Sequence, residues 1–115
     1  MIFENSGLIG LKSDLAYLDE TAEKLGFVRW QWEYTRATYD FKMEDKKNNK
    51  EYYLRINTRA VEGKLENPDA ILAIEAVYMG ITTFPHGLDY ETPIPASFVS
   101  AAEQKIEQLK RNLEA

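Results

Sequence analysis

The single histidine of this chain, His86, lies in the stretch FPHGLDYE. An imidazole titrates near neutral pH, so His86 could act as a general base or a metal ligand, with the nearby Asp89 and Glu91 supplying carboxylates. Its neighbours Pro85 and Gly87 favour a simpler interpretation, because proline suits the second position of a β-turn and glycine accepts a positive φ near its end. We therefore predict a turn, which either closes a pocket or only redirects the chain.

A second set of polar residues alternates with apolar ones in the middle of the chain. Its candidate ligand-binding members are Arg36, Asp40, Tyr53, Arg55 and Arg59, to which we add His86 and Asp89. Charged groups on adjacent strands are more often weak cross-strand ion pairs than reactive centres. The sequence therefore predicts candidate binding residues and no catalytic residue.

Several kinds of site are disfavoured by composition. With one histidine and no cysteine, a metal would have to be held almost entirely by carboxylates, so we predict neither a metal site nor a cofactor. No nucleophile-elbow or phosphate-loop pattern occurs. The stretch RWQWEYTRATYD could form an aromatic and basic platform for stacking bases, but aromatic residues at period two are usually part of a core, and we expect that here.

Net charge argues against nucleic-acid partners. Residues 62–91 carry six acids and one base, which accounts for the whole net charge of −5. Residues 29–59 carry eight bases and five acids, an excess too small to attract a phosphate backbone to an acidic chain. We predict no nucleic-acid binding.

The 115 residues suit a single domain, 1–115, with one hydrophobic core. The start of the chain lacks the basic and apolar regions of a secretory signal, and no apolar run approaches the roughly 20 residues that span a bilayer. We expect a cytoplasmic protein without membrane contact.

The first elements should be a strand and a helix. A weak strand is predicted at about Ile2–Ile9, and the helix should begin with Ser13 as its N-cap and stop at Gly26. Its apolar stripe consists of Leu15, Leu18, Ala22 and Leu25.

Period-two alternation predicts three strands in the middle of the chain. The first should place Val28, Trp30, Trp32 and Tyr34 on one face, and the second, after a change of phase near Thr35 and Arg36, should do the same with Tyr39, Phe41 and Met43. A turn at DKKNNK leads to a third strand. It should point Tyr52, Leu54, Ile56 and Ala60 inward and Tyr53, Arg55, Asn57 and Arg59 outward.

Residues 71–79, ILAIEAVYM, fit a strand buried on both faces, although Asn67, Pro68 and Asp69 would also start a helix. A final helix is predicted from about Ala96 to Leu113. The order is strand, helix, four strands, helix. We therefore predict an α+β fold in which both helices pack on one face of a single curved antiparallel sheet of about four to five strands.

The stretches WEYTRATYDFKMED, YYLRINTRAVEG and FPHGLDYE, followed by a helix after PIPASFV, resemble the YugN-like family of Bacillus-type bacteria over roughly residues 8–113. The resemblance rests on the order and spacing of these stretches. It implies a cytoplasmic protein, and it brings no catalytic residues to this chain.

Taken together, these features favour a non-catalytic binding or regulatory module. We expect a homodimer, because the apolar strand 71–79 and the aromatic excess suit an interface, and we expect a small-molecule or protein partner. Two alternatives stay open: a small enzyme that uses His86 with Asp89, Glu91 or Asp40, and an acidic chaperone-like protein that holds a client.

Overall fold

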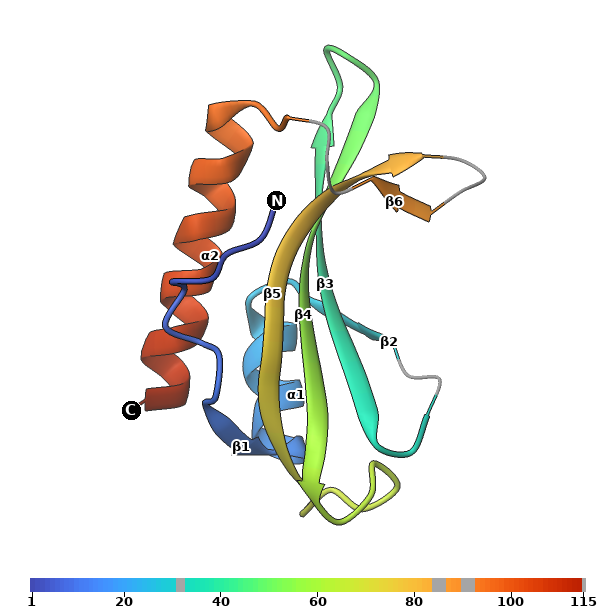
Figure 1. Ribbon diagram of the computed structural model, residues 1–115, viewed down its shortest axis with the longest axis vertical. Coiled ribbons are helices and arrows are strands. Elements are labelled where there is room, and N and C mark those ends of the chain that lie inside the picture. The colour runs from blue at the N-terminus through green and yellow to red at the C-terminus, as the bar shows by residue number, and fades with distance from the viewer. Residues whose placement is uncertain (31–32, 84–86, 90–92, 115) are drawn as a thin grey trace.

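The computed structural model describes residues 1–30, 33–83, 87–89 and 93–114, of which 83 and 87–89 are described by their backbone alone. The elements are β1 (Lys12–Asp14), α1 (Leu15–Lys24), β2 (Val28–Trp30), β3 (Arg36–Asp45), β4 (Lys50–Glu62), β5 (Ile71–Thr83), β6 (Gly87–Asp89) and α2 (Ala96–Glu114). They form one antiparallel sheet with two helices, which confirms the predicted α+β fold (Figure 1).

The strands lie in the order β1-β5-β4-β3-β2, and β6 also pairs with β5 (Figure 1). The far edge of β5 is covered in three places. β1 pairs with its first residues and β6 with its last. Between them the N-terminal segment bonds to it, since the Phe3 amide donates to the Val77 carbonyl and the Met79 amide to the Met1 carbonyl, both at 2.8 Å.

One side of the sheet forms the core with both helices. α1 contributes Leu15, Leu18 and Ala22, α2 contributes Ala102, Ile106 and Leu109, and the strands contribute Tyr39, Tyr52, Leu54, Ile56, Leu72, Ile74, Val77, Met79 and Ile81, all buried. The rings of Tyr52 and Phe98 lie 4.6 Å apart between β4 and α2. Tyr52, Leu54 and Ile56 of β4 are therefore buried as alternation predicted, whereas Ala60, near the end of the strand, is only half-buried.

The stretch 71–79 is a strand, as favoured, and it extends to Thr83 as part of β5. Its burial differs from the prediction. Leu72, Ile74 and Val77 are buried against the helices, but Glu75 is exposed. β5 is therefore buried on one face, because both helices pack on the same side of the sheet.

The predicted N-cap of the first helix is wrong by one residue. The Asp14 carboxylate, not the Ser13 hydroxyl, accepts the Tyr17 amide at 2.9 Å. The Ser13 hydroxyl instead donates to the Asp14 carbonyl. The predicted stop is confirmed, because α1 ends at Lys24 and Gly26 has a φ of 97°.

The predicted strand Ile2–Ile9 does not form. Its regular pairing is a single bridge between Ile2 and Tyr78, and Gly7 and Gly10 turn the chain with φ of 79° and 91°. The first regular strand is β1. The stretch predicted as a turn contains β6, whose three residues pair with Ile81–Thr83.

Candidate binding face of the sheet

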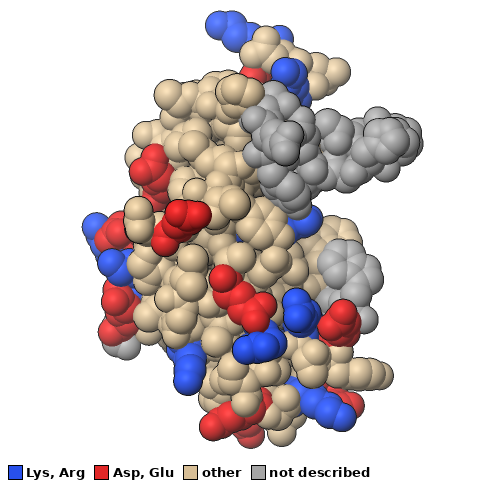
Figure 2. Space-filling view, in the orientation of Figure 1, with Lys and Arg blue, Asp and Glu red and all other residues tan. Residues whose placement is uncertain are grey.

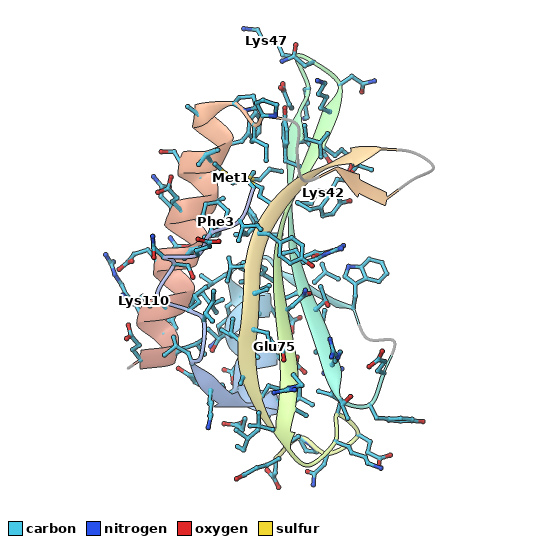
Figure 3. The ribbon with its side chains drawn as sticks, in the orientation of Figure 1. Met1, Phe3, Lys42, Lys47, Glu75 and Lys110 are labelled. Carbon is cyan, nitrogen blue, oxygen red and sulfur yellow. The ribbon has the colours of Figure 1, made fainter. Side chains whose placement is uncertain are left out.

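The side of the sheet away from the helices carries most of the polar residues that the sequence singled out. We call it the outer face and define it by Val28 and Trp30 of β2, Arg36, Thr38, Asp40, Lys42 and Glu44 of β3, Glu51, Tyr53, Arg55, Asn57 and Arg59 of β4, and Glu75 and Tyr78 of β5. Strand alternation places these residues together, since successive side chains of a strand point to opposite faces. Figure 3 labels two of its residues, Lys42 and Glu75, which lie toward opposite ends of it.

A buried ion pair lies at the centre of the outer face. Asp40 and Arg55 are direct partners on β3 and β4, and the Arg55 Nε and Nη2 atoms each donate to one Asp40 carboxylate oxygen at 2.8 Å. The Asp40 side chain is only 4% exposed, although it points away from the helices. Val28 of β2 lies opposite Asp40 on its other side. Bidentate pairs of this kind hold both groups in a fixed orientation.

A cavity of about 240 Å³ opens beside this ion pair. It is lined by Gly26, Val28, Trp30, Asp40, Lys42 and Tyr53. Val28 and Trp30 are 58% and 48% exposed and form an apolar wall. The pKa of Lys42 is raised, chiefly by its hydrogen bond to Glu51 and then by Glu44, so this ammonium stays charged at the rim. The cavity combines an aromatic wall with fixed polar groups.

A chain of hydrogen bonds continues the outer face toward β5. The Thr38 hydroxyl donates to the side-chain oxygen Oδ1 of Asn57 at 3.0 Å, and the side-chain nitrogen Nδ2 of Asn57 donates to the Tyr78 hydroxyl at 2.7 Å. These three side chains come from three adjacent strands. Their bonds fix the orientation of the Asn57 amide.

Two arginines occupy the far end of the outer face. Arg36 and Arg59 are direct partners on β3 and β4, so like charges lie side by side. Glu75 binds Arg59 at 3.0 Å, and Glu33 lies 3.8 Å from Arg36. A second hollow, of about 160 Å³, is lined here by Glu33, Arg36, Thr38, Asn57, Thr58 and Glu75.

The predicted binding residues are thus divided between two places on one face. Asp40 and Tyr53 line the first cavity, and Arg55 is bound to Asp40 beside it. Arg36 and Arg59 form the pair of arginines at the far end of the face. His86 lies outside the described residues. Asp89 is described by its backbone alone, which pairs with Ile81. The ligand-binding roles of Asp89 and His86 therefore stay predictions.

The prediction that the first aromatic strand packs in the core is wrong for the residues that the structure describes. Val28, Trp30 and Tyr34 are all exposed, Tyr34 by 64%, and Trp32 lies outside the described residues. β2 is a short edge strand whose Val28 and Trp30 pair with Asp40 and Thr38, both on the outer face. Asp40 and Thr38 alternate with the buried Tyr39 and therefore face outward. This alternation was the signal that could have placed their partners Val28 and Trp30 on the outer face.

On the helix side, a polar group joins α1 to the sheet. The Tyr39 hydroxyl donates to Asp19 at 2.6 Å, and Arg29 donates to the other Asp19 oxygen at 2.9 Å. Burial raises the pKa of Tyr39 far above its usual value, and the Asp19 bond adds to the rise. A cavity of about 340 Å³ lies over these residues, with Glu23, Phe27 and Val28 completing its wall.

Two kinds of feature are missing from the described residues. No group of three or more histidine, cysteine or acidic side chains is arranged to hold a metal ion there. Neither helix in that part of the chain is long and apolar enough to cross a membrane.

Comparisons with known proteins give a consistent result. The model of the YugN-like family matches residues 4–111. The chain is 34% identical to the uncharacterized protein YlbA of Bacillus subtilis (strain 168) over 114 residues, 96% of this chain and 93% of that protein. It is 38% identical to the uncharacterized conserved protein YugN from Geobacillus kaustophilus HTA426, whose crystal structure superposes with a TM-score of 0.86 and covers 99% of this chain and 95% of that one.

Proposed function

This chain belongs to the YugN-like family, and we propose that it acts as a non-catalytic binding module in the bacterial cytoplasm. Its ligand in this proposal is a small molecule that carries an aromatic ring and a polar group. The ligand binds on the outer face, in the cavity beside Trp30, Asp40 and Tyr53.

The burial of Asp40 is the observation that carries the proposal. A carboxylate that is 4% exposed lines a cavity whose wall also includes the half-exposed indole of Trp30. Ligand sites typically combine apolar and aromatic walls with a few well-placed polar groups. A volume of about 240 Å³ exceeds the roughly 150 Å³ that holds a benzene molecule in an engineered protein cavity.

The pairing of the polar groups favours binding over catalysis. Both Asp40 oxygens accept from Arg55, and Asn57 is held by Thr38 and Tyr78. A general base loses its charge when it accepts a substrate proton, which for Asp40 would sacrifice its salt bridge with Arg55, and the Asn57 amide is not a base. Fixed side chains of this kind suit recognition, because little rotamer freedom is lost when a ligand binds.

A fragment screen by heteronuclear NMR tests the proposal. We expect fragments with one aromatic ring and one polar group to shift the amide signals of Val28, Trp30, Asp40 and Tyr53. Trp30→Ala should weaken such binding at least tenfold, because it removes the stacking wall. Tyr17→Ala removes an exposed aromatic ring from α1, away from the cavity, and should leave binding unchanged.

The outcomes separate the proposal from its competitors. Shifts that cluster elsewhere, or equal losses in Trp30→Ala and Tyr17→Ala, would refute a ligand site at this cavity. Turnover of a bound fragment by the wild-type protein would refute the non-catalytic role while leaving the site in place.

A further inference from the structure

The two edges of the sheet differ in how they are covered. At one edge, β5 is shielded by β1, β6 and the N-terminal segment. At the other edge lies β2, which pairs with β3 and with no other strand of the described part of the chain (Figure 1). All three residues of β2 are exposed, including Arg29, whose side chain reaches Asp19 on the helix side. The free edge of β2 can therefore accept a further strand.

Cavities lie on both sides of this edge, and Val28 belongs to the wall of each. The cavity of about 240 Å³ lies on the outer face, where Val28 and Trp30 line it. The cavity of about 340 Å³ lies on the helix side, between Asp19 and Glu23 of α1 and residues 27–29. When a peptide adds to a sheet edge, backbone hydrogen bonds give affinity and pockets for alternate side chains give specificity. β2 and its two cavities supply both parts of such a site.

The helix-side cavity favours a basic side chain. Its lining contains two acids, Asp19 and Glu23, and one base, Arg29. Asp19 is already engaged, since one of its oxygens accepts from Tyr39 and the other from Arg29. Glu23 is exposed, and its carboxylate forms no hydrogen bond or ion pair with any residue that the structure describes. One negative charge of this cavity is therefore left for a cationic group of a ligand.

Strand geometry fixes how the two side chains of such a ligand are spaced. The outer cavity takes an aromatic ring against Trp30, as in the proposed function. In a strand added beside β2, successive side chains point to opposite faces of the sheet. A residue whose ring enters the outer cavity is therefore next in sequence to one that is directed to the helix side. The site calls for an aromatic residue and a basic residue that are adjacent.

We infer that the ligand is a short extended peptide that adds to β2 as a further strand. Its aromatic side chain fills the cavity beside Trp30, and the adjacent basic side chain pairs with Glu23. The inference rests on the proposed function, because this side chain is the aromatic ring that the outer cavity binds. It adds a backbone contact and a charged contact that a free aromatic fragment lacks.

A synthetic hexapeptide with adjacent phenylalanine and lysine among threonines, blocked at both ends, tests the inference in NMR titrations. We expect it to shift the amide signals of Val28–Trp30 and to slow hydrogen exchange in β2. Replacing its lysine by glutamate should weaken binding about fivefold, the scale of one exposed ion pair. Methylating two successive backbone nitrogens of the peptide should weaken binding about tenfold, because one of the two amides faces β2 and both side chains are kept.

A matched pair of protein variants locates the charged contact. Glu23→Gln should abolish the preference for lysine over glutamate in the peptide. Glu20→Gln is the control, because Glu20 lies on the same helix, is likewise exposed and binds Lys24 outside the cavity. It should leave the preference unchanged.

The outcomes distinguish this inference from the proposed function. Equal binding of the methylated and unmethylated peptides would overturn strand addition, and equal binding of the lysine and glutamate peptides would overturn the contact with Glu23. Binding of aromatic fragments at Trp30 without binding of the peptide would refute the inference and leave the proposed function in place. Absence of both kinds of binding would refute the proposed function as well.

Discussion

Two arginine–carboxylate pairs on the outer face have similar distances but different physical surroundings. The atoms of Arg55 and Asp40 meet at 2.8 Å, and those of Arg59 and Glu75 at 3.0 Å. Asp40 is nearly inaccessible to water, whereas the Arg59 side chain is 55% exposed. Water screens the second pair and replaces a lost partner there. Only the first pair therefore leaves a poorly solvated charge behind when one member is removed.

This difference predicts unequal costs for two alanine substitutions. Asp40→Ala should lower the free energy of unfolding by about 2–4 kcal/mol, somewhat less than the roughly 3–5 kcal/mol for a fully buried pair, since Arg55 keeps some access to water. Arg59→Ala should lower it by about 1 kcal/mol or less. Urea denaturation of both variants measures the contrast. Equal costs would contradict the burial of the Asp40–Arg55 pair.

At the scale of elements, Tyr39 holds α1 and β2 against the sheet. Its hydroxyl donates to Asp19 of α1, which also accepts from Arg29 of β2. The ring is 2% exposed and belongs to the core. One buried phenol therefore joins three elements, and its protonation state matters for how they dock.

Stability in alkali should report this contact. Because the folded pKa of Tyr39 is raised, the unfolded chain releases the phenol proton first, and the free energy of unfolding should fall as pH rises above about 10. Tyr39→Phe should cost about 0.5–1.5 kcal/mol near neutral pH through the lost hydrogen bond. Tyr39→Phe should also remove this alkaline loss. The difference in the free energy of unfolding between the two proteins should therefore shrink and then reverse as pH rises. Urea unfolding at about pH 8 and about pH 11 measures the gap, and a constant gap would contradict the prediction.

Much of this architecture was predictable from alternation. Tyr52, Leu54 and Ile56 are buried, and Arg55 and Asn57 point outward, because β4 is a long central strand whose two faces meet different surroundings. The edge strand was not predictable in the same way. The aromatic ring of Trp30 suits a core, but β2 has only three residues and its register with Asp40 decides which face it joins.

The residues of the candidate site were named from the sequence, but their grouping on the sheet was not. Asp40 and Arg55 were named separately from local alternation, but their pairing across the two strands depends on the register between β3 and β4. That register arises from the turn between the strands and from the packing of both, so it cannot be deduced from one strand. The same holds for β1 and β6, whose three residues each are too few to show a period.

At the scale of the whole molecule, the sheet depends on the covering of its edges. β5 is a long strand with one neighbour along its full length, β4, and its other edge is shared by β1, residues 1–3 and β6. Figure 2 shows basic and acidic side chains interspersed over the face in view, so that face carries no large patch of one sign. Exposed strand edges pair readily with other chains. The middle of β5 is protected chiefly by the N-terminal segment.

Removing residues 1–5 should therefore change both stability and association. The chain would lose the backbone bonds to Val77 and Met79 and the packing of Phe3, which lies with Met1 beside α2 in Figure 3. At about 1 kcal/mol for each bond and 1–2 kcal/mol for the ring, we expect a loss of about 3–4 kcal/mol in the free energy of unfolding. Urea denaturation measures this loss, and light scattering should show larger particles as protein concentration rises.

Ile2→Ala separates the effect of the backbone from that of an exposed side chain. It keeps the bonds of the segment and removes apolar atoms that are already in water, so its stability should stay within about 0.5 kcal/mol of the wild type. If the truncated chain stays as stable and as well dispersed as Ile2→Ala, the middle of β5 needs no cover. Protection of this sheet would then have to come from the bend of β5 and its pairing with β6, and not from the N-terminal segment.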